Sequence, residues 1–356
     1  MGIQSFTPSG GGGTPGFDYI NSINMVTYNR SWAQTGAAGN YVLASYNKNS
    51  GYAYFVGSGV TTGVPLGYVA VVSHAFTSIN IVAPASDYIS LFKASVKSTT
   101  VFNNALDAFA SFPSTITSSG NFILPNNALP LINVLLCGGG GGAHNHSGGG
   151  GGGGVVKLTA YQSVGTTSIT IGAGGYHNPG GQGGATYYGN VYAMGGATSP
   201  DTNQTQHSTT AANGGGFSHN GGHSGTTLGG VGVAQTATTG LGTVGTPQFI
   251  GAYRGGGLTG SFTPNHGGGG GAGAAGDGLQ RTSTGSGTGQ GGPGHMSNIS
   301  GSDTYYGTGG GGAHHASPQV TGTSSTSRGY GSGANSHYSN QSYGDAGAVV
   351  VRYYIP

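Results

Sequence analysis

Short runs of β-branched and aromatic residues, separated by Gly, Pro, Asn and Ser, mark the first third of the chain. Four runs have the length of a strand: Tyr52–Val56, Tyr68–Val72, Ile79–Val82 and Tyr88–Lys93. Regular short strands with turns between them predict a sandwich or barrel. Helical spacing occurs in Phe102–Ser111, where Phe102, Leu106 and Phe109 share one face, so we expect a short helix there.

Two apolar runs enclose the remainder of the chain. Leu131–Cys137 precedes the first glycine run, and Gly347–Ile355 closes the sequence. We expect these two strands to pair and to close one domain. Between them, Val155–Tyr161 and Ser168–Ile171 predict a second strand pair. The domain boundaries that follow are 1–114 for an N-terminal β domain and 115–356 for a glycine-rich domain.

Glycine marks the change between the two regions. Only 14 of the 80 glycines precede residue 138. The later ones form repeated runs: Gly138–Gly142, Gly148–Gly154, Gly214–Gly216, Gly255–Gly257, Gly267–Gly271 and Gly309–Gly312. A linker needs one such run, whereas repetition favours extended segments packed closely where no Cβ intervenes. The sequence therefore predicts an all-β fold: an N-terminal β-sandwich-like domain, and a glycine-rich β domain with packed polyglycine-type segments.

Charge is scarce, which excludes several classes of function. Charged residues make up 4% of the chain, glutamate is absent, and the formal net charge is +2. No basic stripe is available for nucleic acid, and seven scattered aspartates do not predict a catalytic carboxylate pair. No P-loop and no nucleophile elbow occurs, and a G-x-G-x-x-G at Gly287, Gly289 and Gly292 is followed by Pro293 and lacks a strand–helix context. We therefore expect no enzyme activity. The sequence further predicts no secretory signal, no membrane insertion and, with one cysteine, no disulfide framework.

The order of the motifs from residue 115 onward resembles a known family. The motifs are Val134–Ala143, Gly148–Lys157, Ser168–Gly175, Gly180–Ala185, Tyr192–Gly196 and the closing strand Gly344–Tyr354. They resemble the glycine-rich C-terminal domain of phage tail fibres and related virion proteins and, more loosely, the glycine-rich adhesins of T-even-like phages. The resemblance implies packed polyglycine helices that support host-selecting loops. It also implies a virion location on the tail or a surface appendage, virion-protein partners, a host surface glycan or protein as target, and a homotrimer.

Aromatic and polar residues beside the glycine runs are the candidate recognition residues. Tyrosine offers a large contact area with a hydrogen-bonding tip at small entropic cost. The candidates are Tyr176, His177, Asn178, His219, Asn220, His223, Tyr253, Arg254, Tyr305, Tyr306, His314, His315, His337 and Tyr338. Packing of the glycine layers is the competing interpretation of these tyrosines. His144 and His146 form an H-x-H pair that could hold a transition-metal ion; no other cofactor is expected.

These sequence patterns are compatible with three functions. The first is a fibre or adhesin subunit that attaches to the host cell surface. The second is a capsid or tail decoration protein that uses the glycine-rich domain as a rigid spacer without recognition. The third, a silk-like matrix protein, is disfavoured because the segments between the glycine runs are irregular in length.

Overall fold

A computed structural model describes most of the chain, and the described residues contain strands but no helix. The described residues are 17–45, 50–85, 87–94, 110–126, 128–129, 131–143, 148–162, 165–176, 181–199, 211–213, 218–219, 226–227, 242–243, 248–256, 258–259, 267–268, 270–279, 281–282, 289–313, 323–324, 326–337 and 342–355. They form two compact units. The first comprises Met1–Phe112, Pro125–Leu129 and Tyr353–Pro356, and the second comprises Pro113–Leu124 and Pro130–Arg352.

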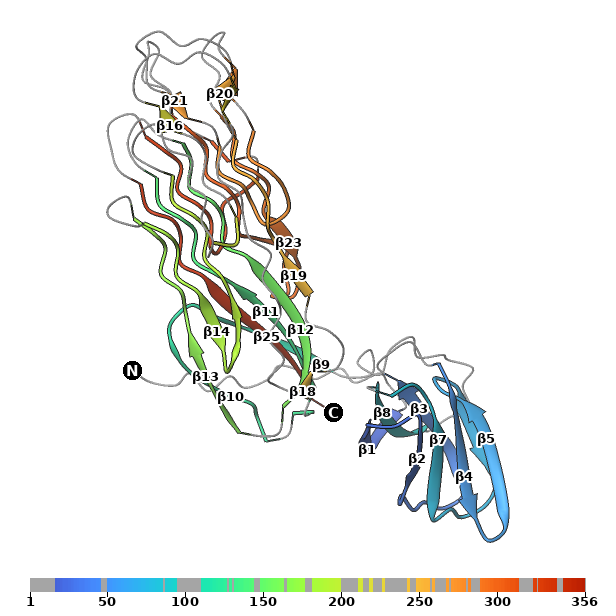
Figure 1. Cartoon of the computed structure of the whole chain (residues 1–356). Helices are drawn as coiled ribbons and strands as arrows, with labels where there is room; N and C mark the ends of the chain where they lie inside the picture. The colour runs from blue at the N-terminus through green and yellow to red at the C-terminus, as the bar shows by residue number, and fades with distance from the viewer. Residues whose placement is uncertain are drawn as a thin grey trace. The chain divides into compact units, whose positions relative to one another are not determined.

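The first unit contains two four-stranded antiparallel sheets (Figure 1). One sheet has the order β1 (Phe17–Met25), β8 (Asp87–Ala94), β3 (Gly39–Ser45) and β6 (Val69–Val72). The other has the order β2 (Asn29–Trp32), β7 (Ser78–Val82), β4 (Tyr52–Gly57) and β5 (Val60–Pro65). Side chains from both sheets share one buried core, as in a β-sandwich.

Alternation along the strands determines which side chains enter this core. On β4, Ala53 and Phe55 are fully buried, whereas Tyr52 and Tyr54 face outward. Phe55 and Phe76 meet edge to face with ring centroids 5.0 Å apart. Aromatic pairs of this geometry stabilise a core beyond the area that they bury. The all-β prediction for this region is therefore confirmed, and β4, β6, β7 and β8 lie where the four apolar runs predicted strands.

The predicted helix Phe102–Ser111 is contradicted at its C-terminal end. Residues 101–109 lie outside the described residues, but Ala110–Ile116 forms strand β9 and therefore includes Ser111. The sequence of β9, ASFPSTI, is rich in β-formers and contains a proline, which opposes continuation of a helix.

Two larger sheets form one end of the second unit. The first has the order β10 (Gly120–Ile123), β13 (Thr166–Thr170), β14 (Thr186–Tyr188) and β15 (Val191–Ala193). The second has the order β18 (Gly242–Thr243), β12 (Val155–Tyr161), β11 (Leu131–Cys137), β25 (Ala348–Ile355) and β9, with β19 (Gln248–Ile250) also paired to β12. The remaining short strands are β16 (Ser218–His219), β17 (Thr226–Thr227), β20 (Leu258–Thr259), β21 (Gly267–Gly268), β22 (Arg281–Thr282), β23 (His295–Ser297) and β24 (Thr304–Tyr306).

Strand pairing confirms one expectation for this unit and overturns another. β11 and β25 are hydrogen-bonded neighbours, as the two enclosing apolar runs predicted. The predicted pair of β12 with β13 is wrong, because β12 pairs with β11 and β13 pairs with β10 and β14. Most of β12 is buried, which suits the middle of a large sheet. β13 alternates between exposed and buried positions, which suits a sheet with one solvated face.

Beyond these sheets, extended glycine segments run side by side toward the short strands β16, β20 and β21 (Figure 1). Residues 138–143 illustrate the hydrogen bonding, since each N–H binds a carbonyl of a neighbouring segment. Gly138 and Gly141 donate to Gly154 and Gly151, Gly139 and Gly142 to Gly184 and Gly181, and Gly140 and Ala143 to Asp345 and Ser342. Residues three apart therefore bind the same neighbour, which is the periodicity of a threefold polyproline-II-type helix.

The carbonyls of this segment bind three further neighbours. Gly139 and Gly142 accept from Gly196 and Ser199, Gly140 accepts from Gly175, and Gly141 accepts from Ala334. Six segments therefore surround residues 138–143, three accepting from it and three donating to it. The predicted polyglycine packing is confirmed, and we call this hydrogen-bonded array of segments the glycine lattice.

Candidate functional site

Segments of the glycine lattice run alternately away from the sheets and back toward them. Residues 138–143, 172–176, 194–199, 307–313 and 331–337 run away, and residues 148–154, 181–185 and 342–347 return, as their hydrogen-bond registers show. Their far ends lie in one layer. Gly142 N donates to Gly181 O at 2.8 Å, Ser199 N donates to Gly142 O at 3.1 Å, and Ala143 and Ser342 form an isolated bridge. We call this end of the lattice, opposite the sheets, the distal end.

Seven of the fourteen candidate recognition residues, and both residues of the candidate metal pair, fall in parts of the chain that the structure does not describe. His144, His146, His177, Asn178, Asn220, His223, His314, His315 and Tyr338 are outside the described residues. Several of the stretches that connect lattice segments are nevertheless fixed at both flanks. Residues 144–147, 177–180 and 338–341 each follow an outgoing segment and precede a returning one. The lattice therefore brings the two ends of all three stretches to the distal end.

Two exposed tyrosines lie at the distal end among the described residues. Tyr176 is the last residue of one outgoing segment and is 52% exposed, and Tyr343 is the second residue of a returning segment and is 62% exposed. Their ring centroids are 6.4 Å apart with an interplanar angle of 46°. Tyr176 was among the predicted residues. Tyr343 was not, although it immediately precedes Gly344 and so follows the same pattern of an aromatic residue beside glycine. His337 is partly buried at the end of the segment 331–337.

The remaining described candidates lie on other elements. Tyr253 and Arg254 belong to the segment 251–256, and the Arg254 N–H donates to the Asp277 carboxylate at 2.7 Å. Tyr305 and Tyr306 lie on β24 beside the sheets, and Tyr306 is fully buried. Its ring stacks on Tyr330 with centroids 5.9 Å apart.

Burial removes the ring of Tyr306 from any surface contact of this chain, which corrects its assignment as a recognition residue. It belongs instead to a hydrophobic cluster with Leu135, Cys137 and Val350. His219 forms β16 and pairs with Gly267.

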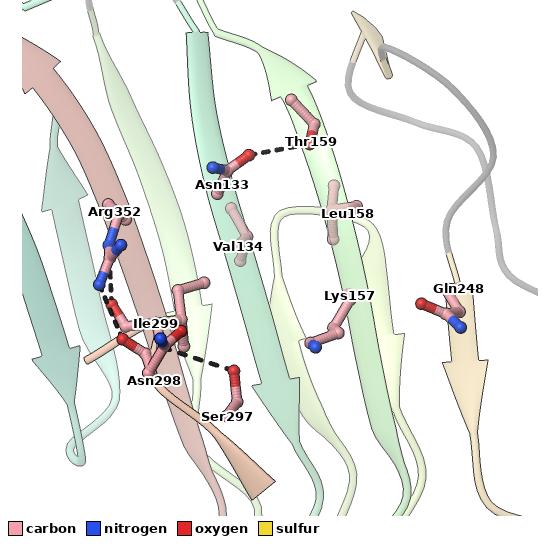
Figure 2. Close-up of a pocket in the computed structure, with 10 residues that line it drawn as sticks. All are labelled: Asn133, Val134, Lys157, Leu158, Thr159, Gln248, Ser297, Asn298, Ile299 and Arg352. Atoms are coloured by element: carbon pink, nitrogen blue, oxygen red, sulfur yellow. Dashed lines mark hydrogen bonds between the residues drawn. The ribbon is translucent and has the colours of Figure 1, made fainter. Parts of the chain in front are cut away.

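An open cleft lies between the six-stranded sheet and residues 297–299 (Figure 2). Its volume is about 390 Å³, and its lining comprises Asn133, Val134, Lys157, Leu158, Thr159, Gln248, Ser297, Asn298, Ile299 and Arg352. Along β12, Lys157 and Thr159 alternate with buried apolar residues, so the pleat directs them to one face of the sheet, where Asn133 of β11 lies opposite Thr159. Thr159 donates to the Asn133 side-chain oxygen at 2.8 Å.

Of the described residues that line the cleft, two are charged, and both are cations. The Arg352 guanidinium donates through Nε to Ile299 O at 3.0 Å and through Nη2 to Asn298 O at 2.7 Å. Nearby, burial lowers the pKa of His295, and the positive charge of Lys157 lowers it further. The cleft therefore carries a positive potential that reaches a neighbouring side chain.

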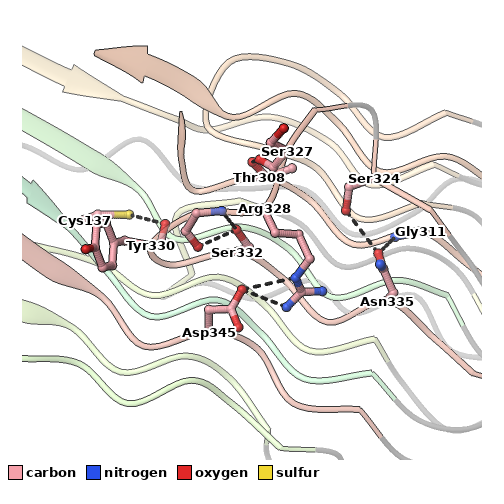
Figure 3. Close-up of polar contacts among 11 residues, drawn as sticks. Cys137, Thr308, Gly311, Ser324, Ser327, Arg328, Tyr330, Ser332, Asn335 and Asp345 are labelled. Atoms are coloured by element: carbon pink, nitrogen blue, oxygen red, sulfur yellow. Dashed lines mark hydrogen bonds and ion pairs between the residues drawn. The ribbon is translucent and has the colours of Figure 1, made fainter. Parts of the chain in front are cut away.

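A polar cluster connects residues 326–337 to the neighbouring lattice segments 307–313 and 342–347 (Figure 3). Arg328 forms an ion pair with Asp345 at 2.8 Å, and Asn335 accepts from Gly311 N at 2.8 Å. The Cys137 thiol donates to Tyr330 O at 3.3 Å, and burial raises its pKa. Cys137 is therefore a buried, protonated thiol with a structural role.

Neither a metal cluster nor a membrane helix is found among the residues that the structure describes. Groups of three or more potential metal ligands are absent there, while the candidate pair His144 and His146 lies outside this part of the chain. The described residues also include no helix with the length and apolarity needed to cross a bilayer.

These features define a class of protein: an all-β chain whose sheets continue into a lattice of mutually hydrogen-bonded glycine segments. The chain belongs to the glycine-rich domain family, whose pattern matches residues 116–354. Comparison with curated proteins gave no match.

Proposed function

We propose that this chain is a bacteriophage virion protein, a tail-fibre or adhesin subunit that attaches the particle to the host cell surface. The observation that carries the proposal is that the described residues flanking three connecting stretches lie together at the distal end of the lattice, with the exposed Tyr176 and Tyr343 among them. Recognition residues are commonly placed on loops that a rigid scaffold positions. The motif order of residues 115–356, which resembles phage fibre proteins, supports the same function.

In this proposal the two units have separate roles. The sandwich joins the chain to other virion proteins, and the distal end contacts a host glycan or protein. The low charge favours contacts through hydrogen bonds and aromatic faces over electrostatic steering. Three copies of the chain assemble, without nucleic acid and without insertion into the membrane.

Replacement of two connecting stretches at the distal end, tested in the assembled particle, checks the proposal. Residues 144–147 and 338–341 are replaced together by Gly-Ser linkers of equal length, and particle adsorption to host cells is measured. The control replaces the exposed turn 301–303, which lies between β23 and β24. Cryo-electron microscopy establishes that each variant is incorporated and where it is located.

We expect the distal exchange to abolish adsorption and the control exchange to leave it intact. Normal adsorption by particles that contain the distal variant would instead support a rigid decoration protein. Absence of the chain from particles would reject both roles.

A further inference from the structure

The cleft on the six-stranded sheet lies at the opposite end of the lattice from the residues proposed to contact the host. Strands β12 and β25, which help to form it, are otherwise uncharged, with sequences VVKLTAY and AVVVRYYI. Each therefore carries one cation within an apolar strand. Cations in such positions require a partner or access to water.

Arg352 has its partners within the protein. Its Nε and Nη2 hydrogens bind the carbonyls of Ile299 and Asn298, so this edge of the guanidinium cannot also bind a phosphate or carboxylate in the two-pronged manner. This arrangement gives Arg352 a structural role: it holds the 298–299 backbone against the sheet.

No comparable partner is found for the Lys157 ammonium group among the residues that the structure describes. None of the described residues that line the cleft is acidic, and no described carboxylate forms an ion pair with this ammonium group. Its charge acts instead on His295, whose pKa it lowers in addition to the effect of burial. Since a lysine ammonium is a compact point charge with three donors, it suits a single anionic group.

The other polar residues that line the cleft indicate which kind of molecule carries the anionic group. Gln248 and Asn298 are exposed amides, which both donate and accept hydrogen bonds, and Ser297 adds a hydroxyl. Sugar hydroxyls also donate and accept, so this lining complements them. A volume of about 390 Å³ is near the lower end of the range for small-molecule sites.

We propose that this cleft binds an acidic saccharide, with its carboxylate on Lys157 and its hydroxyls on the neighbouring amides. The site is separate from the distal end, so the proposal stands independently of the attachment function. A free phosphate fits less well, because the fork of Arg352 is already occupied and one ammonium remains.

Calorimetric titration of the full chain with an oligogalacturonate of two to four sugars tests this proposal. The methyl ester of the same oligosaccharide keeps the hydroxyls and removes the charge, and inorganic phosphate tests the anion alone. Lys157→Gln removes the ammonium, and Lys93→Gln, at an exposed position on β8, is the matched control. Circular dichroism establishes that both variants are folded.

We expect saturable binding of the oligogalacturonate, weakened about tenfold or more by esterification and by Lys157→Gln, because a charged hydrogen bond is lost. Lys93→Gln leaves the affinity unchanged. Equal binding of the ester, equal binding by a folded Lys157→Gln variant, or no saturable binding would overturn the proposal. Binding of phosphate without binding of the saccharide would overturn the saccharide assignment.

Discussion

Glycine in the lattice is required for space rather than for an unusual backbone angle. A Cβ placed on Gly141 would lie 1.9 Å from the Ala197 carbonyl oxygen, and one on Gly140 would lie 2.0 Å from Ser332 O. Neither glycine has a positive φ. Because the obstructing atoms are backbone atoms that also accept or donate lattice hydrogen bonds, they cannot move without breaking those bonds.

Gly141→Ala should therefore be severely destabilising. We expect it to lower the free energy of unfolding by at least about 3 kcal/mol, because the added methyl overlaps fixed backbone. Urea denaturation of the full chain measures the change. Gly120→Ala is the control, since a Cβ there meets nothing within 4 Å, and its effect should stay within about 0.5 kcal/mol. Similar effects of the two substitutions would contradict tight packing.

Lys157→Gln should raise the pKa of His295. Burial is the larger cause of the lowered pKa and persists in the variant, so the new value should still be below the ordinary value of about 6.5. NMR titration of the imidazole measures it. The fold favours neutral His295, so this residue's contribution to stability is present above about pH 6.5 and is lost as the pH falls through its folded pKa. An unchanged pKa would place Lys157 too far from His295 to affect it.

At the residue scale, the pattern of tyrosine beside glycine does not predict which of these tyrosines are exposed. Tyr176 is exposed at the distal end, whereas Tyr306, in a similar sequence context, is buried against Tyr330. Both are tyrosines close to glycine. The difference depends on the side of β24 that faces the core, which three residues of strand are too short to reveal.

At the scale of elements, buried polar side chains join glycine-rich extended segments that have few side chains to interlock. Asn213 is fully buried, and its amide nitrogen donates to Gly152 O at 2.8 Å and to Gly153 O at 3.3 Å. Its side-chain oxygen accepts from Tyr253 N at 3.3 Å. One side chain thereby connects the segments 148–154, 211–213 and 251–256.

Asn213→Ala should destabilise the lattice more than loss of the surface ion pair between Arg328 and Asp345 does. We expect a decrease of about 1–3 kcal/mol in the free energy of unfolding, because buried backbone groups lose their partner. The comparison is Arg328→Gln, which removes a pair whose side chains are 33% and 44% exposed and should change stability by less than about 1 kcal/mol. The reverse order of effects in urea denaturation would contradict this role for Asn213.

Elements with strong apolar patterns were predictable, and their pairing was only partly so. Leu131–Cys137 forms a strand with the predicted bounds, and its pairing with the closing strand followed from the position of both at the edges of the glycine-rich region. The pairing of β12 with β13 failed because proximity in sequence was taken as proximity in the sheet. Segments 138–143 and 148–154 both belong to the lattice and run in opposite directions. β12, which follows the second segment, therefore pairs with β11, which precedes the first.

For the whole molecule, continuity of chain between sheets and lattice has a consequence for stability. β11 continues directly into residues 138–143, and residues 148–154 continue directly into β12. Each of these two continuous stretches therefore forms the hydrogen bonds of the β-sheet at one end and those of the glycine lattice at the other. Opening of the lattice would pull on the six-stranded sheet, so the two should behave as one cooperative unit.

Amide hydrogen exchange on the full chain can measure this cooperativity. We expect the N–H groups of residues 138–143 and 150–154 to be protected to the same degree as those of β11, since each donates to a carbonyl of another segment. Gly141→Ala should reduce protection of both the lattice and β11 together, while the sandwich strands β3 and β8 retain theirs because they belong to the other unit. Rapid exchange of the glycine segments beside a protected β11 would show that the lattice opens by itself. A lattice of that kind could not hold the distal residues in fixed positions, and the proposed attachment function would lose its physical basis.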